Sequence, residues 1–292
     1  MNVVWRAVQR LRGRQSQDPG RDRARLYAYL GPDLALTQLV DGHFIYVDPS
    51  DEQIAHNLIA RGYWEDWIDK AIASLVRPGD RVVDVGANLG YYTLRIAGMI
   101  GPAGRLDAFE ANPRLAEIVA RSVGFNGYDD RVRLHKAAAG DRCGELSFSI
   151  SRRQGGSGHI AEAAADEGSA RQTITVPCVR LDDVIEGPID LLRMDAEGSE
   201  PLVLEGARTL LSRSPEIRIC MEWANEMMSS RRSVPDLIAW LRGQGFRFWL
   251  IATDGAFPEL SDAELLALPL NDLLICRSFP TGLNEQVRRT SS

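Results

Sequence analysis

The fold of this chain is decided by residues 82–94, VVDVGANLGYYTL. The three valines suit a strand buried on both faces, and the two glycines permit a tight turn ahead of a helix. Asp84 interrupts the apolar run, and a lone carboxylate is costly to bury unless it is paired or lies at the end of the strand. The stretch therefore predicts a strand, a turn and a helix of the kind that begins a nucleoside-cofactor site.

The turn itself narrows the class of cofactor. A dinucleotide fingerprint of the G-x-G-x-x-G type needs glycine where this chain has Asn88 and Tyr91. Asp84 precedes the turn, and a carboxylate there repels phosphate. A cofactor with no phosphate and with a positive charge or an amino group fits better, and S-adenosylmethionine is such a cofactor. Gly86, Asn88 and Gly90 would line its methionine and ribose end, while Asp84 would bond either the loop or the amino group of the cofactor.

A second carboxylate marks the ribose end of the predicted site. Glu110 follows Gly86 by 24 residues and ends the apolar run 106–109. A carboxylate at this place accepts hydrogen bonds from two ribose hydroxyls. Asn112-Pro113 comes next, and proline is favoured in the first turn of a helix, so Glu110 could also cap that helix. The two roles do not exclude each other.

Strand-like and helix-like patterns then alternate as far as about residue 252. This alternation is typical of a parallel sheet with helices on both faces, so the expected fold class is α/β with a Rossmann-like sheet. A final strand over 270–276 is expected as an antiparallel edge partner of 246–251. The other strands are expected at 81–85, 105–109, 131–136, 189–194 and 216–222, and the helices at 89–99, 113–124, 200–212 and 233–243.

The chain is predicted to have four parts. Residues 1–26 form a flexible basic tail, and residues 27–79 form an extension with a hairpin around Asp41-Gly42 and two helices. The main domain spans residues 80–278, and residues 279–292 form a second flexible tail. An insertion at about 144–179 interrupts the main domain. Its two predicted strands are joined by a loop of more than 20 residues, and so long a loop in a compact domain is typical of a lid or of disorder.

Composition and charge exclude several classes of function. The chain has 292 residues and a net charge of −6. Seven arginines against two aspartates give residues 1–26 a net charge of +5, so the remainder is −11, which argues against nucleic acid as the main partner. The basic segment would at most contact an anionic membrane surface, and a disordered tail is the alternative that we favour.

No apolar run is long enough to span a bilayer, and no secretory signal is visible. The four cysteines lack metal-site spacing, so free thiols and a cytoplasmic location are expected.

A second group of carboxylates follows two later strands. Asp195, Glu197 and Glu200 come directly after the predicted strand 189–194, and Glu222 ends the strand 216–222. Ligands of open α/β sheets bind outside the carboxyl ends of the strands, where Asp84 and Glu110 are also expected. Glu200 precedes Pro201 and is explained as first-turn charge of a helix. Asp195 and Glu222 lack such an explanation and are candidate functional residues.

Taken together, these motifs resemble the FkbM family of S-adenosylmethionine-dependent methyltransferases. The resemblance covers residues 80 to about 225, and its most specific part is 189–207, IDLLRMDAEGSEPLVLEGA. The usual family form has Lys-Ile-Asp-Val-Glu-Gly, so Arg193, Met194 and Ala196 depart from it. The family implies a seven-strand class I methyltransferase sheet. It also implies methyl transfer to oxygen on sugars, glycolipids, polyketides and other natural products.

The resemblance and the positions of the residues suggest further roles. Asp141 would meet the adenine amino group, or would be a plain turn residue. An aliphatic hydroxyl gives up its proton reluctantly, so a base or a metal is expected. Asp195 and Glu222 would share a hard cation such as Mg²⁺. Without a metal, Asp195, Glu197 or His159 in the predicted lid would be the base, although a lone histidine is more often incidental.

The acceptor side is indicated by aromatic residues in the extension. Tyr63 and Trp64 could stack on a sugar ring or could be ordinary core aromatics. The sequence therefore predicts an O-methyltransferase that acts on a carbohydrate or glycan-type acceptor, with a small natural product as a further possibility. The alternatives are a nicotinamide-dependent oxidoreductase, against which Asn88 and Tyr91 speak, and a binding protein on a methyltransferase fold.

Overall fold

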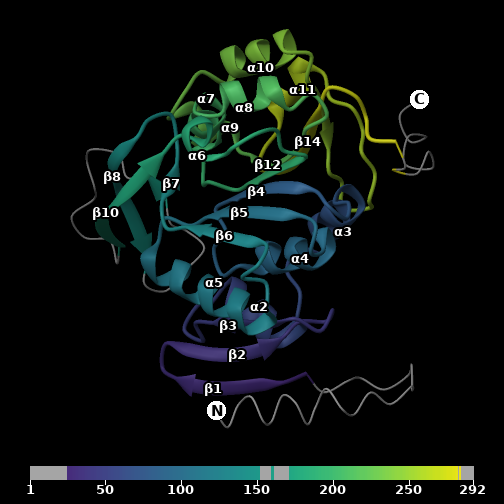
Figure 1. Cartoon of the computed structure of the whole chain (residues 1–292). Coiled ribbons are helices and arrows are strands. Elements are labelled where there is room, and N and C mark those ends of the chain that lie inside the picture. Colours follow the sequence, from purple (N-terminus) through teal and green to yellow (C-terminus); the bar gives the residue numbers. More distant parts are fainter. Residues whose placement is uncertain (1–24, 152–158, 161–170, 282, 284–292) are drawn as a thin grey trace.

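The computed structural model of the chain describes residues 25–151, 159–160, 171–281 and 283. A seven-stranded sheet with the order β13-β14-β12-β11-β4-β5-β6 lies at its centre (Figure 1). β14 is antiparallel to both of its neighbours, while the remaining adjacent pairs are parallel. The predicted α/β fold with a seven-strand sheet is confirmed. The strands are β4 (Arg81–Val85), β5 (Arg105–Phe109), β6 (Val132–His135), β11 (Leu191–Met194), β12 (Arg218–Trp223), β13 (Arg247–Leu250) and β14 (Asn271–Cys276).

Helices cover both faces of this sheet, and alternate side chains of each strand belong to different cores. Val82 joins the cluster with α2 (Ile54–Arg61), α3 (Asp66–Leu75), α4 (Tyr91–Ile100) and α5 (Pro113–Asn126). Val83 and Val85 join the opposite cluster. That cluster includes residues of α6 (Leu181–Val184), α7 (Glu200–Glu205), α8 (Arg208–Arg213), α9 (Asn225–Ser229), α10 (Val234–Gly243) and α11 (Asp262–Ala267). None of the described helices is long and apolar enough to cross a membrane.

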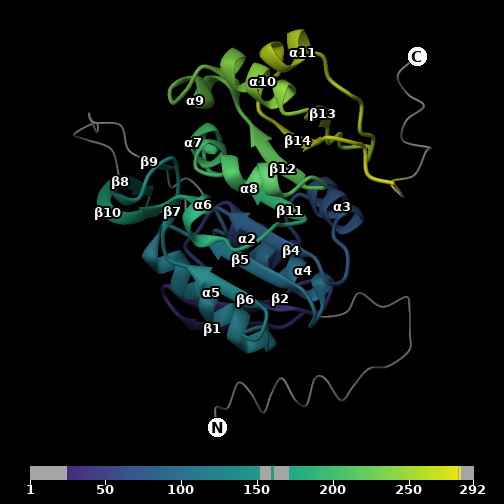
Figure 2. The same ribbon diagram turned by 45° about the horizontal axis from the view of Figure 1, so that its top comes forward.

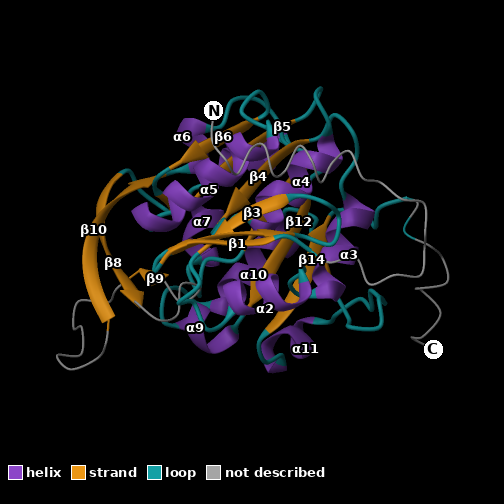
Figure 3. Cartoon of the chain, turned by 90° about the horizontal axis from the view of Figure 1, so that it is seen from below, coloured by secondary structure: helices purple, strands orange, loops and turns teal. Residues whose placement is uncertain are grey.

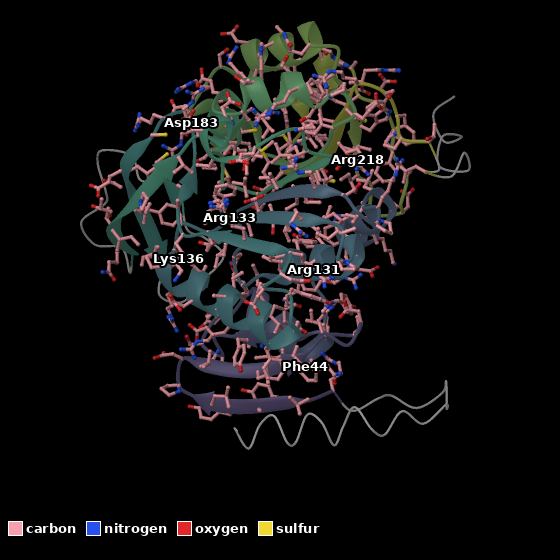
Figure 4. All side chains as sticks on the ribbon, in the orientation of Figure 1. Phe44, Arg131, Arg133, Lys136, Asp183 and Arg218 are labelled. Atoms are coloured by element: carbon pink, nitrogen blue, oxygen red, sulfur yellow. The ribbon has the colours of Figure 1, made fainter. Side chains whose placement is uncertain are left out.

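A small antiparallel sheet lies below α5 and consists of β1 (Tyr27–Gly31), β2 (Leu34–Gln38) and β3 (Phe44–Val47) (Figures 1 and 3). The predicted hairpin corresponds to β2 and β3. Side chains of α5 complete the free edge of β3: Asn126 Oδ1 accepts from the Phe44 amide at 3.0 Å, and Ser122 Oγ accepts from the Tyr46 amide at 3.0 Å. Phe44 is labelled in Figure 4. These bonds fix the extension to the main domain.

The insertion builds a third sheet at one end of the main one, beside α6 and α7 (Figure 2). Its order is β7-β10-β8-β9. The two predicted strands correspond to β8 (Gly144–Ser151) and β10 (Arg171–Val179), which pair in antiparallel register. β7 (Ala138–Ala139) and β9 (His159–Ile160) are short additions. The predicted lid falls largely on residues 152–158 and 161–170, which are outside the described residues.

Two sequence-based expectations about elements are wrong. Residues 271–276 pair antiparallel with β13, as expected, but they do not form an edge strand, because β14 lies between β12 and β13. Its last four side chains are buried, which suits an internal strand. The helix expected over 200–212 is divided into α7 and α8. Gly206 lies at the division, where a Cβ would stand 1.9 Å from the Gly140 carbonyl oxygen.

Candidate active site

The turn after β4 is fastened to the ends of two neighbouring strands. The amides of Gly86 and Ala87 both donate to the Phe109 carbonyl at 3.0 Å, and the Asp195 amide donates to the Val85 carbonyl at 3.1 Å. Gly86 has a φ of 78°, and Asn88 has a φ of 54°. The first value favours glycine, and the second is tolerated by asparagine better than by most other residues. Gly90 is the N-cap of α4 and packs on Val119 of α5, away from the residues that line the cleft described next.

A cleft of about 630 Å³, including the open solvent at its mouth, lies between this turn and the loops after β5 and β11. None of the described residues that line it is lysine or arginine. The lining residues are Val85, Gly86, Asn88, Phe109, Glu110, Ala111, Asn112, Leu115, Ala137, Ala138, Ala139, Phe148, Asp195, Ala196, Glu197 and Ser199.

Glu110 joins the turn after β4 to the loop after β5. One carboxylate oxygen accepts from the Asn88 amide at 2.7 Å, and the other accepts from the Asn112 amide at 2.8 Å. Its side chain is only 6% exposed, and burial raises its pKa to about 7. Asn112 caps α5 by accepting from the Arg114 amide at 3.0 Å. Glu110 is thus held at the wall of the cleft by the backbone of both loops.

Two buried oxygens on the wall of the cleft lack a hydrogen-bond partner. They are Asn88 Oδ1 and Ser199 Oγ. Buried polar atoms in native proteins are nearly always bonded, so such atoms beside a cleft indicate places that a ligand would satisfy. They fit a polar ligand that lies between the turn after β4 and the loop after β11.

Asp84 lies behind the turn and is fully buried. It accepts from Thr93 Oγ1 at 2.7 Å and from Arg193 Nη1 at 3.3 Å. It is not among the residues that line the cleft. Of the two roles that the sequence left open for Asp84, these contacts favour support of the loop over direct contact with the cofactor.

The loop after β11 brings Asp195 and Glu197 to the other side of the cleft. Asp195 accepts from Arg193 Nη2 at 2.9 Å, and its side chain is 37% exposed. Glu197 has a φ of 50°. Among the described residues the non-glycine residues with positive φ are Glu65, Asn88 and Glu197, and strained conformations of this kind gather at functional sites.

A further group of carboxyl groups lies beyond Asp195. Glu222 of β12 stands opposite Asp272 of β14 in the sheet register. Burial, followed by the charge of Asp195, raises the pKa of Glu222 to about 9, and burial, followed by the charge of Glu65, raises the pKa of Asp272 to about 7. Burial also raises the pKa of Glu65, which accepts from the Tyr92 hydroxyl at 3.0 Å. Burial and the neighbouring carboxylates thus favour the neutral form of Glu222. The group lies next to Asp195 without lining the same cleft.

Three other predicted residues are placed differently. Asp141 accepts from Arg232 Nη2 at 2.7 Å and lines a separate hollow with Arg142 and Cys178, so it does not border the cleft. Glu200 is fully buried and accepts from the Ala196 amide at 2.7 Å, which is more than first-turn charge. Its pKa is raised to about 7 by burial. His159 begins β9, and its side chain is outside the described part of the chain.

The predicted metal pair, Asp195 and Glu222, is not joined by a third ligand among the described residues. Within the described ranges no three His, Cys, Asp or Glu side chains form a group that could hold a metal ion. Of the predicted pair, Asp195 already bonds Arg193 through one oxygen. The expected Mg²⁺ thus finds no complete ligand set among these residues.

Sequence reasoning missed several members of the site. Arg193 was noted only as a departure from a family motif, and Asp272 and Tyr92 were not considered. Their proximity depends on lateral strand order, which periodicity does not reveal. The signal that existed for Arg193 and Asp272 was a charged residue within an otherwise apolar strand.

Comparison with known proteins agrees with this arrangement. The family described as Methyltransferase FkbM domain matches residues 84–248, more than half of the chain. The chain belongs to the FkbM methyltransferase family. The matched FkbM domain contains the turn after β4, Glu110 and the loop after β11. The predicted family is confirmed, and so is the predicted enzyme class of the domain, an S-adenosylmethionine-dependent methyltransferase.

Individual relatives of the FkbM domain are distant. Demethylmenaquinone methyltransferase of Symbiobacterium thermophilum is 29% identical over 103 residues, which are 33% of this chain and 41% of that protein. Catechol O-methyltransferase B of Danio rerio is 34% identical over 71 residues, 24% of this chain and 26% of that protein. The chain thus spans less than half the length of these two relatives. The crystal structure of methyltransferase FkbM from Methylobacillus flagellatus KT is 15% identical, with a TM-score of 0.43, and the match covers 71% of this chain and 50% of that chain.

Proposed function

We propose that this protein transfers a methyl group from S-adenosylmethionine to a hydroxyl of a carbohydrate or glycan-type acceptor, with a small natural product as the other acceptor class. The charge of the cleft is the observation that carries the proposal. Glu110, Asp195 and Glu197 line it, and none of the described lining residues is lysine or arginine. Such a wall favours a cation and repels the pyrophosphate of a dinucleotide.

The cofactor-binding residues follow from their places on the wall. Glu110 is proposed to accept from the ribose hydroxyls through the lone pairs that Asn88 and Asn112 leave free. Gly86, Asn88 and Asn112 line the remainder, and Asp195 supplies negative charge at the opposite side. S-adenosylmethionine supplies an electrophilic methyl group on a positively charged sulfur when it is bound. Gly90 and Asp84 support the loop from outside the cleft.

The protein must orient the acceptor hydroxyl and accept its proton. Asp195 and Glu197 lie on the cleft wall and are the proposed candidates for proton acceptor, as is His159. Glu222 lies next to them, and because its pKa is about 9 it would donate or hold a proton at neutral pH rather than accept one. Correct placement supplies much of the rate in such a reaction. No step is proposed through a metal.

The carbohydrate acceptor is supported by the extension. The carboxylate of Glu65 belongs to the acidic group beyond Asp195. In the sequence Glu65 directly follows Trp64, whose ring is half-buried. Aromatic rings pack against sugar C–H faces, and carboxylates accept from sugar hydroxyls. Tyr63 and Trp64 also pack against the core that joins α2–α5, so part of each ring serves the fold.

Calorimetric titration with S-adenosylmethionine and, separately, with NAD tests the proposal. The wild-type protein should bind S-adenosylmethionine and not NAD. Glu110→Gln should weaken binding by about tenfold or more, since a hydrogen bond to a charged group contributes roughly 1.5–3 kcal/mol. Glu117→Gln is the matched control, because Glu117 lies exposed on α5 and pairs with Lys136. Binding of NAD alone, or equal affinity of both variants, would contradict the proposal.

A further inference from the structure

We propose that Arg193 is a positioning residue that holds the cofactor turn and Asp195 in one fixed relation. The proposal rests on the proposed function, because it assigns Arg193 a task in that same site. Arg193 lies in β11, two residues before Asp195, and is only 7% exposed. It does not line the cleft, so it acts through residues that do.

The guanidinium group joins both sides of the site from behind. Its Nη1 donates to the Gly86 carbonyl at 2.9 Å, and its Nη2 donates to Asp195 Oδ2 at 2.9 Å. Gly86 and Asp195 both line the cleft. One rigid planar group thus sets the separation between the turn after β4 and the carboxylate after β11.

The buried charge is balanced by groups on the same face of the sheet. Arg193 Nη1 also contacts Asp84 Oδ1 at 3.3 Å, and the guanidinium carbon lies 4.5 Å from the centre of the Tyr92 ring. Tyr92 in turn donates to Glu65 at 3.0 Å. These contacts tie the extension, α4 and two strands to one cation, which restricts the directions in which the guanidinium can move.

Lysine would keep the charge and lose this geometry. Arginine presents several N–H donors in a fixed fork, whereas a lysine ammonium is a single point of charge. One nitrogen cannot occupy the places of Nη1 and Nη2 at once. Lysine is the usual family residue at this position, so Arg193→Lys separates the fork that this chain has in its place from simple charge balance.

Arg218 provides a matched control within the same sheet. It lies in the adjacent strand β12, is 6% exposed, and pairs with Asp80 at 2.9 Å. Its Nε donates to the Asp190 carbonyl at 3.0 Å. Arg218, labelled in Figure 4, is the first residue of β12, whereas the cleft lies beyond the last residues of β4, β5 and β11. Arg218→Lys removes a comparable buried fork without touching the site.

The experiment compares S-adenosylmethionine affinity by calorimetry with melting temperature by circular dichroism. Arg193→Lys should weaken binding by about tenfold, the loss expected for one or two misplaced hydrogen bonds. Arg218→Lys should lower the melting temperature and leave the affinity within about twofold of wild type. Asp195→Asn and the double variant Arg193→Lys/Asp195→Asn complete a cycle. Because Arg193 acts partly through Asp195, the double variant should lose less affinity than the product of the two single-variant losses.

Each result bears on the proposal. Wild-type affinity in Arg193→Lys, losses that multiply in the double variant, or equal loss of affinity in Arg218→Lys would each overturn it. Should Arg193→Lys fail to fold, Arg193→Gln is measured in its place with the same expectation. If the wild-type protein does not bind S-adenosylmethionine at all, the proposed function fails first, so the two failures are distinguishable.

Discussion

Gly86 and Asp195 lie so close together that no side chain fits at position 86. A Cβ on Gly86 would stand 1.9 Å from the Asp195 carbonyl oxygen, and Gly86 also has a φ of 78°. Both facts require glycine, one through space and one through conformation. This contact joins the turn after β4 to the loop after β11, which carries Asp195 and Glu197 to the wall of the cleft.

The two requirements can be separated by substitution. Gly86→Ala should destabilise the protein by more than ~3 kcal/mol, the range expected when backbone strain is joined by a steric clash. Gly79→Ala is the control, because Gly79 has a φ of 88° and open space around it, and should cost only about 1 kcal/mol. Urea unfolding measures the free energy of unfolding of both variants. Equal losses would show that the close approach of Gly86 to Asp195 is unimportant.

The buried pair of Asp84 and Arg193 should be sensitive to loss of one partner. Asp84→Asn leaves the guanidinium with less compensating charge, and breaking a buried pair costs about 3–5 kcal/mol. Asp130→Asn is the matched exposed change, because Asp130 pairs with Arg131 at the surface, and it should leave the free energy of unfolding unchanged. Denaturant titration of both variants is the measurement. A small effect of Asp84→Asn would mean that Thr93 and water replace the pair.

The buried carboxyl groups should make the ligand-free protein less stable at high pH. Burial raises the pKa of Glu110, Glu200 and Asp272 to about 7 and that of Glu222 to about 9. The folded protein therefore binds more protons than the unfolded chain between about pH 4 and pH 9, so stability falls as the pH rises.

We expect the melting temperature to be lower at pH 9 than at pH 6 by at least ~4 °C. Asp41, whose pKa is lowered, adds no slope there because it is ionised in both states. Glu222→Gln should flatten the upper part of the profile, whereas Glu117→Gln at the surface should not. A melting temperature that rises between pH 6 and pH 9 would disprove the raised pKa values.

Asp141 tests whether the adenine end was correctly predicted. Because Asp141 pairs with Arg232 and lies outside the cleft, Asp141→Asn should change the affinity for S-adenosylmethionine by less than about twofold, below one ordinary hydrogen bond. The loss of affinity in Glu110→Gln, measured by the same calorimetry, serves as the reference. A loss of tenfold in Asp141→Asn would restore the predicted contact with the adenine amino group.

Much of the central sheet could be predicted from the sequence. The bounds expected for β4 and β5 agree with the structure, because their apolar residues are buried on both faces and flanked by turn residues. The carboxylates at the strand ends were also expected together. β1 was missed because its residues are largely exposed and carry no alternation.

The contacts across the sheet could not be predicted. Asp84 meets Arg193 across 109 residues of sequence, and this pairing depends on β4 and β11 being neighbours in register. Asp272 joins the site only because β14 is antiparallel, so that its first residues lie where the parallel strands end. Local patterns contain no information on either neighbour.

The position of β14 also determines when the sheet can be completed during synthesis. β13 is joined to the sheet through β14. β14 in turn pairs with β12, which places Ile275 beside Ile219, a residue far away along the chain. When the ribosome has made the chain as far as β13, the strand that pairs with both β12 and β13 has therefore not yet been made. Until residues 271–276 emerge, the edge of β12 that β14 covers stays unpaired, and an unpaired strand edge favours aggregation.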